Sequence, residues 1–329
     1  MRIAVIGAGL AGLSFVTSLG GSDKADISVF EKSLGVGGRL ATRRRDDFQF
    51  DHGAQFFTCR SNSLKELLSN QDTADSISEW QPKLVTLKAD SKPFKRSWFE
   101  PHYVGSPTMT ALPKMLASQC DVKLGTRVTR IDRVGTQWQL VGDNESSLGH
   151  YDWVVSAMPA PQATDLFSDR FEHAERLKSV EMSPCFALML ALRQMPKLNF
   201  GAAIVQESPI VWIADNSAKP NRPQNASLLV HSDNSWAKQH LEESLEFVED
   251  KLLSALSDLI PIRPTDILHT SLHRWRYAKV ELEAGENFLI DEKAGLATIG
   301  DWCRGNRAED AFLSGAALAD HFGSELLMR

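Results

Sequence analysis

The sequence predicts an α/β protein whose two domains are interleaved along the chain, and three observations support this prediction. An apolar run at 3–6, helical apolar spacing over 10–19 and a second apolar run at 27–30 form a βαβ unit with parallel strands. Two more buried strands are expected far along the chain, at 153–156 and 297–301. The length of 329 residues exceeds that of most single domains.

The first domain is expected to contain the parallel sheet, and the second to be an α+β unit with a mixed or antiparallel sheet. Within the second domain we expect a polar helix at 63–70, a strand at 186–192 and one amphipathic helix from Trp236 to Leu256. A final helix at about 308–322 closes the first domain. The resulting division assigns residues 1–60, 99–163 and 273–329 to the first domain and residues 61–98 and 164–272 to the second.

Composition and charge restrict the kind of partner that the protein binds. The chain is 43% hydrophobic and 24% charged, and its formal net charge of −6 provides no basic field for nucleic acid or an anionic membrane. Its four cysteines lack the spacing of a zinc site or a disulfide framework, so no metal is expected. We expect a small-molecule partner and no obligate protein partner. Because no signal-peptide pattern precedes the first strand, we also expect a cytoplasmic location.

The segment Gly7-Ala8-Gly9-Leu10-Ala11-Gly12 fits the GxGxxG pattern between the first strand and the first helix. Such glycines permit a tight turn, close approach of a pyrophosphate and tight packing of helix on strand, as in Rossmann-type domains. Glu31 ends the second strand 19 residues after Gly12, where a carboxylate accepts hydrogen bonds from ribose hydroxyls and repels a 2′-phosphate. FAD or NAD is therefore favoured over NADP. The alternative is a glycine-rich turn with a solvated carboxylate.

A second glycine-rich segment, Gly35-Val36-Gly37-Gly38-Arg39, distinguishes between these two dinucleotides. Gly38 offers bare backbone, and the Arg39 guanidinium donates paired hydrogen bonds to phosphate oxygens. A flavin pyrophosphate requires both groups close to the first glycine loop. The segment therefore favours FAD, and the single GxGxxG pattern disfavours a resident nicotinamide domain.

Further segments are similar to those of a known family. Asp51-His52-Gly53-Ala54-Gln55-Phe56-Phe57-Thr58 resembles the stretch that passes a flavin ring, and Gly300-Asp301-Trp302-Cys303 resembles a C-terminal flavin-binding segment. Together with Pro159–Gln162 and His273–Ala278, they resemble the renalases, in the amine oxidase branch of the glutathione-reductase-like flavoproteins. The resemblance extends over almost the whole chain. It implies non-covalent FAD and oxidation of the 2- and 6-dihydro isomers of NAD(P)H to NAD(P)⁺, with O2 reoxidising the flavin to give hydrogen peroxide.

The resemblance also implies which residues contact FAD. Asp301 would accept a hydrogen bond from a ribityl hydroxyl, and the helix that begins near Ala308 would direct its positive end at the flavin N1/C2 edge. Phe56 stands where relatives commonly have tyrosine. The full set of expected cofactor contacts is Gly7, Gly9, Ala11, Gly12, Glu31, Lys32, Gly38, Arg39, Gly53, Ala54, Gln55, Phe56, Val128, Asp301, Trp302 and Ala308.

The same resemblance makes flavin N5 the hydride acceptor, and no catalytic side chain is expected. A dihydronicotinamide becomes an aromatic cation as its hydride leaves, so it requires no general base. Histidine can bind its carboxamide, arginine a phosphate, and tryptophan can form a pocket wall; a structural hydrogen bond or core packing is the alternative for each. The substrate-binding candidates are Thr58, Arg60, Trp98, His231, Arg274 and Trp302, with Trp212, Trp236 and Trp275 as further tryptophans.

Two alternatives to a dihydro-NAD(P) oxidase are open at this point. Amine oxidases of the same fold usually have a lysine near flavin N5, and neither Lys279 nor Lys293 matches that motif. A flavin-bound sensor without turnover would have the same glycine loop. The three hypotheses predict different responses to dihydronicotinamides and amines.

Overall fold

A six-stranded sheet forms the centre of the first domain in the structure, a computed structural model that describes residues 1–20 and 24–328. Its neighbouring strands are parallel except for the pair at one edge. In spatial order, they are β19 (Leu289–Asp291), β20 (Leu296–Thr298), β13 (Trp153–Ser156), β1 (Arg2–Ile6), β2 (Asp26–Phe30) and β9 (Val122–Lys123). Because β2 and β13 flank β1, the strand order reverses at β1. Ligands of such sheets bind at this point, beyond the carboxyl ends of the strands.

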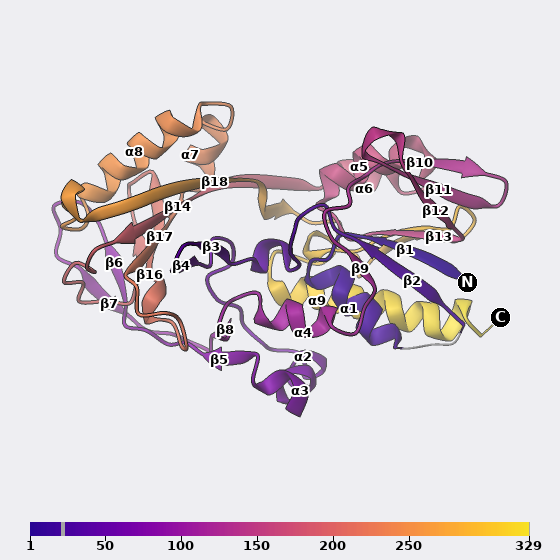
Figure 1. Cartoon of the computed structure of the whole chain (residues 1–329), viewed down its shortest axis with the longest axis horizontal. Coiled ribbons are helices and arrows are strands. Elements are labelled where there is room, and N and C mark those ends of the chain that lie inside the picture. Colours follow the sequence, from indigo (N-terminus) through magenta and orange to yellow (C-terminus); the bar gives the residue numbers. More distant parts are fainter. Residues whose placement is uncertain (21–23, 329) are drawn as a thin grey trace.

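Helices cover one face of this sheet, and helices with a small antiparallel sheet cover the other. The first layer contains α1 (Leu10–Leu19), α4 (Ala111–Ala117) and α9 (Ala308–His321). The second contains α5 (Ala160–Phe167), α6 (Ala174–Lys178), β10 (Val128–Val134), β11 (Gln137–Gly142) and β12 (Ser147–Tyr151). Figure 1 shows α1 beside α9. Gly315 permits this close contact, because a Cβ there would lie 2.2 Å from the Ala11 carbonyl oxygen.

A seven-stranded mixed sheet forms the second domain. In spatial order, its strands are β18 (Ile267–Leu282), β14 (Glu181–Leu192), β17 (Ser227–Ser232), β16 (Ile210–Asp215), β15 (Ala202–Val205), β6 (Leu84–Leu87) and β7 (Phe94–Arg96). Only the β15–β6 pair is parallel among them. The helices α7 (Asn234–Gln239) and α8 (Leu245–Ser257) lie over one face (Figure 1). The predicted combination of a parallel-sheet domain and a mixed-sheet domain is confirmed.

A short hairpin lies between the two domains. It consists of β3 (Arg43–Arg45) and β4 (Phe48–Phe50), and Figure 1 shows it beneath the second sheet, on the face opposite α8. Phe50 of this hairpin packs with Met189 and Leu229, which lie on β14 and β17. The chain that follows the hairpin therefore passes between the two sheets.

The structure divides the two domains differently from the sequence prediction. The helix α2 (Asn62–Ser69) shares the core of the first domain and contacts α9, whereas β6 and β7 join the second sheet, so residues 61–98 belong to both domains. The predicted boundary at residue 273 lies inside β18, because this strand pairs with β14 without a break in the element from Ile267 to Leu282. The short elements α3 (Gln71–Ala74) and β5 (Ile77–Glu79) precede β6 in the chain, and β8 (Tyr103–Gly105) follows β7 and pairs with β5.

The expected single helix from Trp236 to Leu256 is two helices. Asp233 caps α7 by accepting a hydrogen bond from the Trp236 N–H, and Ser244 caps α8 by accepting one from the Phe247 N–H. A serine whose side chain accepts a hydrogen bond from the backbone N–H three residues later marks the N-terminus of a helix, so α8 begins anew after α7. Apolar spacing alone does not reveal this interruption. No helix in the described residues has the length and apolar character needed to cross a membrane.

Candidate functional site

The glycine loop between β1 and α1 has the shape of a phosphate-binding turn. Gly7 has φ +111°, and a Cβ at Gly12 would lie 2.2 Å from the Gly7 carbonyl oxygen, so α1 packs directly on the loop. A Cβ at Gly9 would meet no described heavy atom within 4 Å. No described side chain caps the first turn of α1. Its N–H groups are therefore available to an anionic ligand, which the helix dipole also favours.

Glu31 lies next to this loop at the end of β2. One carboxylate oxygen accepts a hydrogen bond from the Ala8 N–H at 2.9 Å, and the other accepts one from the Ser33 N–H at 2.8 Å. Each oxygen has a further lone pair, so the carboxylate can also accept from ribose hydroxyls. Lys32 and Val128 were also expected to contact FAD. Val128 is buried at the start of β10, and Lys32 is exposed.

Arg39 and Asp301 form a bidentate ion pair, although 262 residues separate them in the sequence. The two guanidinium nitrogens of Arg39 lie 2.8 and 2.6 Å from the two carboxylate oxygens. Gly38, at φ +54°, lies close to the Cα of Gly9. The structure thus brings together the phosphate-binding and ribityl-binding residues expected from the sequence. In this structure, the Arg39 guanidinium that was expected to bind phosphate oxygens pairs with the Asp301 carboxylate.

The N-terminus of α9 lies at the same edge of the sheet and contains two carboxylates. Ala308 is the first residue of the helix, followed by Glu309 and Asp310 in its first turn. Glu309 accepts hydrogen bonds from the backbone N–H groups of Arg60 and Ser61 at 2.8 and 2.6 Å. Burial raises the pKa of Glu309, but these donors outweigh it and hold the pKa below its ordinary value. These carboxylates partly offset the positive helix end that was expected to face the flavin.

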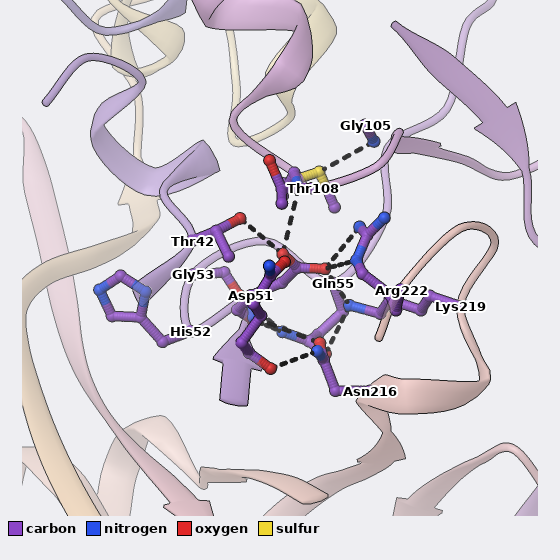
Figure 2. Close-up of polar contacts among 12 residues, drawn as sticks. Thr42, Asp51, His52, Gly53, Gln55, Gly105, Thr108, Asn216, Lys219 and Arg222 are labelled. Carbon is purple, nitrogen blue, oxygen red and sulfur yellow. Dashed lines mark hydrogen bonds and ion pairs between the residues drawn. The ribbon is translucent and has the colours of Figure 1, made fainter. Parts of the chain in front are cut away.

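A buried charge cluster holds the loop that follows β4 (Figure 2). The Asp51 carboxylate lies 3.1 Å from Lys219 Nζ and 2.7 Å from an Arg222 nitrogen, and the Thr42 hydroxyl donates to it at 2.7 Å. All three charged side chains are buried. Burial alone raises the pKa of Asp51, but the two cations outweigh this effect and leave it well below its ordinary range. Burial lowers the pKa of Lys219 to about 8 against the attraction of Asp51.

The same cluster fixes the conformation of residues 51–55. The Gln55 side chain folds back, so that its amide donates to the Gly53 carbonyl at 3.0 Å and its oxygen accepts from Lys219 at 3.3 Å. A Cβ at Gly53 would lie 2.0 Å from the Arg39 carbonyl oxygen, so the loop also packs on the glycine-rich segment. His52 points away from the charge cluster (Figure 2). Ala54 lies half-buried between these anchored residues.

On the other side of this loop lies a cluster of neutral histidines. The His52 carbonyl accepts hydrogen bonds from the Trp275 Nε1–H at 2.9 Å and from His231 Nε2 at 3.2 Å. The His52 and His273 ring centroids are 4.9 Å apart. Burial lowers the pKa of His52 to about 3 and the pKa of both His231 and His273 to about 4. These rings therefore present uncharged polar groups at neutral pH.

An aromatic cluster continues from the histidines along the second sheet. The Phe56 ring centroid lies 5.5 Å from that of Trp98, 4.4 Å from that of His102 and 5.8 Å from that of Trp212. The strand register places Trp212 in the same row across the second sheet as His231 and His273. The aromatic cluster and the histidine cluster therefore share the inner face of that sheet. This row consists of His273, Ala187, His231, Trp212 and Ile204 on β18, β14, β17, β16 and β15.

Three predicted substrate residues lie away from these clusters. Arg274 follows His273 on β18 and so points to the opposite face, where it lies over the Phe186 ring at 5.6 Å. Trp302 is fully buried in the core and donates its indole N–H to the Met158 carbonyl at 3.0 Å. Trp236 lies on α7, and its ring stacks on that of His240.

The remaining candidates lie near the outer end of the loop. Arg60 is exposed and forms an ion pair with Glu100, and Thr58, two residues earlier in the chain, is half-buried. His102, Lys219 and Arg222 are not among the residues predicted from the sequence. Asp51 did lie within a recognised segment, but its two cationic partners follow 168 and 171 residues later without any local pattern.

These features define a two-domain protein with a dinucleotide site on a parallel sheet and a mixed sheet facing the carboxyl ends of its strands. The chain belongs to the family of flavin-containing amine oxidoreductases, which matches residues 97–321, and an NAD(P)-binding Rossmann-like domain matches residues 5–70. Membership in this family implies an oxidoreductase with a flavin cofactor.

Individual relatives agree with this assignment and with the predicted resemblance to the renalases. The chain is 26% identical to renalase from Mus musculus over 297 residues, which cover 85% of each protein. The structure is similar to a putative protoporphyrinogen oxidase from Exiguobacterium sp. 255-15, with a TM-score of 0.77, 13% identity and coverage of 98% and 99% of the two chains. Cyclohexylamine oxidase from Brevibacterium oxydans IH-35A gives a TM-score of 0.75 at 13% identity, with 99% of each chain covered. At such identities the structural similarities establish the fold alone.

Proposed function

We propose that the protein is an oxidase that holds FAD non-covalently and transfers a hydride from 2- and 6-dihydro isomers of NAD(P) to the flavin. The products would be β-NAD(P)⁺ and, after reoxidation by O2, hydrogen peroxide. The observation that supports this substrate best is the lining of the inner face. Phe56, Trp98 and Trp212 offer flat rings, and His231 and His273 are neutral, which suits a planar uncharged ring better than an ammonium group.

The described residues fit FAD as the cofactor. The open backbone at Gly9 and the uncapped first turn of α1 suit a pyrophosphate, and the Glu31 carboxylate suits the adenosine ribose. Arg39 and Asp301 lie where the rest of the dinucleotide would pass. When bound, the flavin supplies the hydride acceptor and the group that O2 reoxidises.

Non-covalent attachment is supported by the state of Cys303, the cysteine within the C-terminal segment that resembles a flavin-binding one. Its side chain is fully buried, and burial raises the pKa of the thiol to about 12. A thiol in this state is a poor nucleophile and has no access to a ring outside the core.

The chain's own contribution to the reaction would be orientation and exclusion of water. The charge cluster of Asp51, Lys219 and Arg222 anchors the loop that bears Phe56. The loop and the inner face of the second sheet then hold the substrate ring between them. No side chain needs to remove a proton, because hydride loss makes the nicotinamide ring aromatic.

The test is anaerobic mixing of the purified yellow protein with borohydride-reduced NAD⁺, followed at about 450 nm, where oxidised flavin absorbs. We expect rapid bleaching by the 2- and 6-dihydro isomers, none by pure 4-dihydro-NADH, and hydrogen peroxide when air is admitted. Bleaching by amines but not by these isomers would overturn the proposal in favour of an amine oxidase. Bound flavin that neither set of compounds bleaches would indicate a sensor.

An amine oxidase is the second candidate, favoured by the family match and by the similarity to cyclohexylamine oxidase. The lysines considered from the sequence do not support it. Lys279 is an exposed residue of β18 that pairs with Glu281, and Lys293 is exposed in the turn between β19 and β20.

A further inference from the structure

We propose that the aromatic cluster recognises the carboxamide of the substrate ring through two nitrogens, Trp212 Nε1 and His102 Nδ1. This inference rests on the proposed function and adds the residues that select the ring substituent. Both nitrogens are buried, and neither has a hydrogen-bond partner among the described residues. Buried polar atoms nearly always have partners, because an unpaired one loses its hydration without compensation. Two such atoms around one phenylalanine therefore point to a polar ligand group.

The two rings that carry these nitrogens pack against the same phenylalanine, Phe56. The Phe56 centroid is 4.4 Å from that of His102 and 5.8 Å from that of Trp212. Trp98 contacts both Phe56 and His102, with centroid distances of 5.5 and 4.1 Å, while its own indole N–H donates to the Pro82 carbonyl. Trp98 can therefore offer only its face to a ligand. The polar groups that remain for a ligand are those of Trp212 and His102.

The chemistry of these nitrogens matches a primary carboxamide. The indole N–H of Trp212 can only donate, so it requires an acceptor such as a carbonyl oxygen. Burial lowers the pKa of His102 against the opposing backbone hydrogen bond and charge of Glu100, so the ring is neutral, with one donor and one acceptor nitrogen. In the tautomer with its proton on Nε2, Nδ1 is the acceptor. A carboxamide supplies both partners, with its oxygen for Trp212 and its NH2 group for His102.

Other substituents would leave one partner unmatched. An ammonium group can only donate, so the Trp212 N–H would remain unpaired. A carboxylate would bring a charge among rings that provide no cation, and its desolvation would oppose binding. A methyl ketone keeps the acceptor for Trp212 but lacks the NH2 group for His102. The cluster should therefore prefer carboxamide over acetyl, by the value of one hydrogen bond.

This difference gives a test with the FAD-loaded protein. The dissociation constants of NAD⁺ and of 3-acetylpyridine adenine dinucleotide are measured by calorimetry, and flavin bleaching is followed with the corresponding reduced isomers. One neutral hydrogen bond corresponds to about fivefold to tenfold in affinity, so the wild-type protein should bind NAD⁺ more tightly by this factor. His102→Phe should abolish the difference. Trp212→Phe should weaken both ligands by a similar factor and leave the difference unchanged.

A control variant and a conservative variant separate recognition from folding. Trp236→Phe changes a tryptophan on α7, over the opposite face of the sheet, and should alter neither ligand. His102→Asn, which retains a donor and an acceptor, should restore part of the preference. The inference is overturned if the preference survives in His102→Phe, or if Trp212→Phe binds both ligands as tightly as the wild type does. If the wild-type protein neither binds NAD⁺ nor is bleached by the isomers, the proposed function itself fails.

Discussion

Replacing Asp51 by asparagine should destabilise the protein more than any surface charge change. Asp51 is the only carboxylate in contact with Lys219 and Arg222 among the residues that the structure describes. Asparagine preserves the shape of the side chain but removes its charge. Two buried cations would then repel each other and would lack the anion that compensates their desolvation.

The expected loss follows from the burial of these groups. Removing one partner of a buried ion pair costs about 3 to 5 kcal/mol. Unfolding entropy of about 2.1 cal/mol/K per residue gives roughly 0.7 kcal/mol/K for 329 residues, so the melting temperature should fall by about 4 to 7 °C. Because the pKa of Asp51 is lowered, its contribution is present at all pH values above its ordinary pKa and is lost only in strong acid.

Thermal unfolding followed by circular dichroism at one fixed FAD concentration measures this effect. Glu207→Gln is the matched control, because Glu207 pairs with Lys88 on the surface at 2.7 Å with 71% of its side chain exposed. Exposed pairs contribute about 0 to 1 kcal/mol, which shifts the melting temperature by little more than 1 °C. If the two variants melt at the same temperature, the charge cluster does not anchor the loop as argued. A double variant, Asp51→Asn with Lys219→Met, should recover part of the loss.

Three further predictions concern the cofactor site and the neutral histidines. Glu31→Ala should lower FAD content, measured by absorbance after gel filtration, because the carboxylate next to the glycine loop is removed; unchanged content would contradict the ribose contact. Gly12→Ala should lower the melting temperature of the apoprotein because its Cβ would meet the Gly7 carbonyl, whereas Gly9→Ala should leave that temperature unchanged and reduce only FAD binding. Since the pKa of His231 is lowered from 6.5 to about 4, the unfolded chain binds its proton first, and wild-type stability should fall as the pH drops through this range. Urea unfolding of His231→Asn should show a shallower fall, and an equal slope would mean that His231 is not neutral in the fold.

Local sequence patterns were sufficient to predict the cofactor domain. The strand at 3–6, the helix at 10–19 and the strand at 27–30 form as β1, α1 and β2, and Glu31 lies beside the glycine loop. Each of these features depends on residues close together in the chain: apolar spacing selects the element, and glycines permit the turn. The similarity to renalase and the family match confirm the resemblance that the sequence motifs predicted.

Contacts between distant segments were decided only by the tertiary structure. The sequence placed Arg39 and Asp301 in one cofactor site but not in contact, and it gave no indication that Asp51 pairs with Lys219 and Arg222. It also selected Arg274, which alternation along β18 turns to the outer face of the sheet. Strand register and domain packing determine which side chains meet, and both depend on pairings between separate segments of the chain. The sequence by itself therefore determined the dinucleotide fold and its glycine loop, whereas the packing of two sheets decided which residues line the inner face of the second sheet.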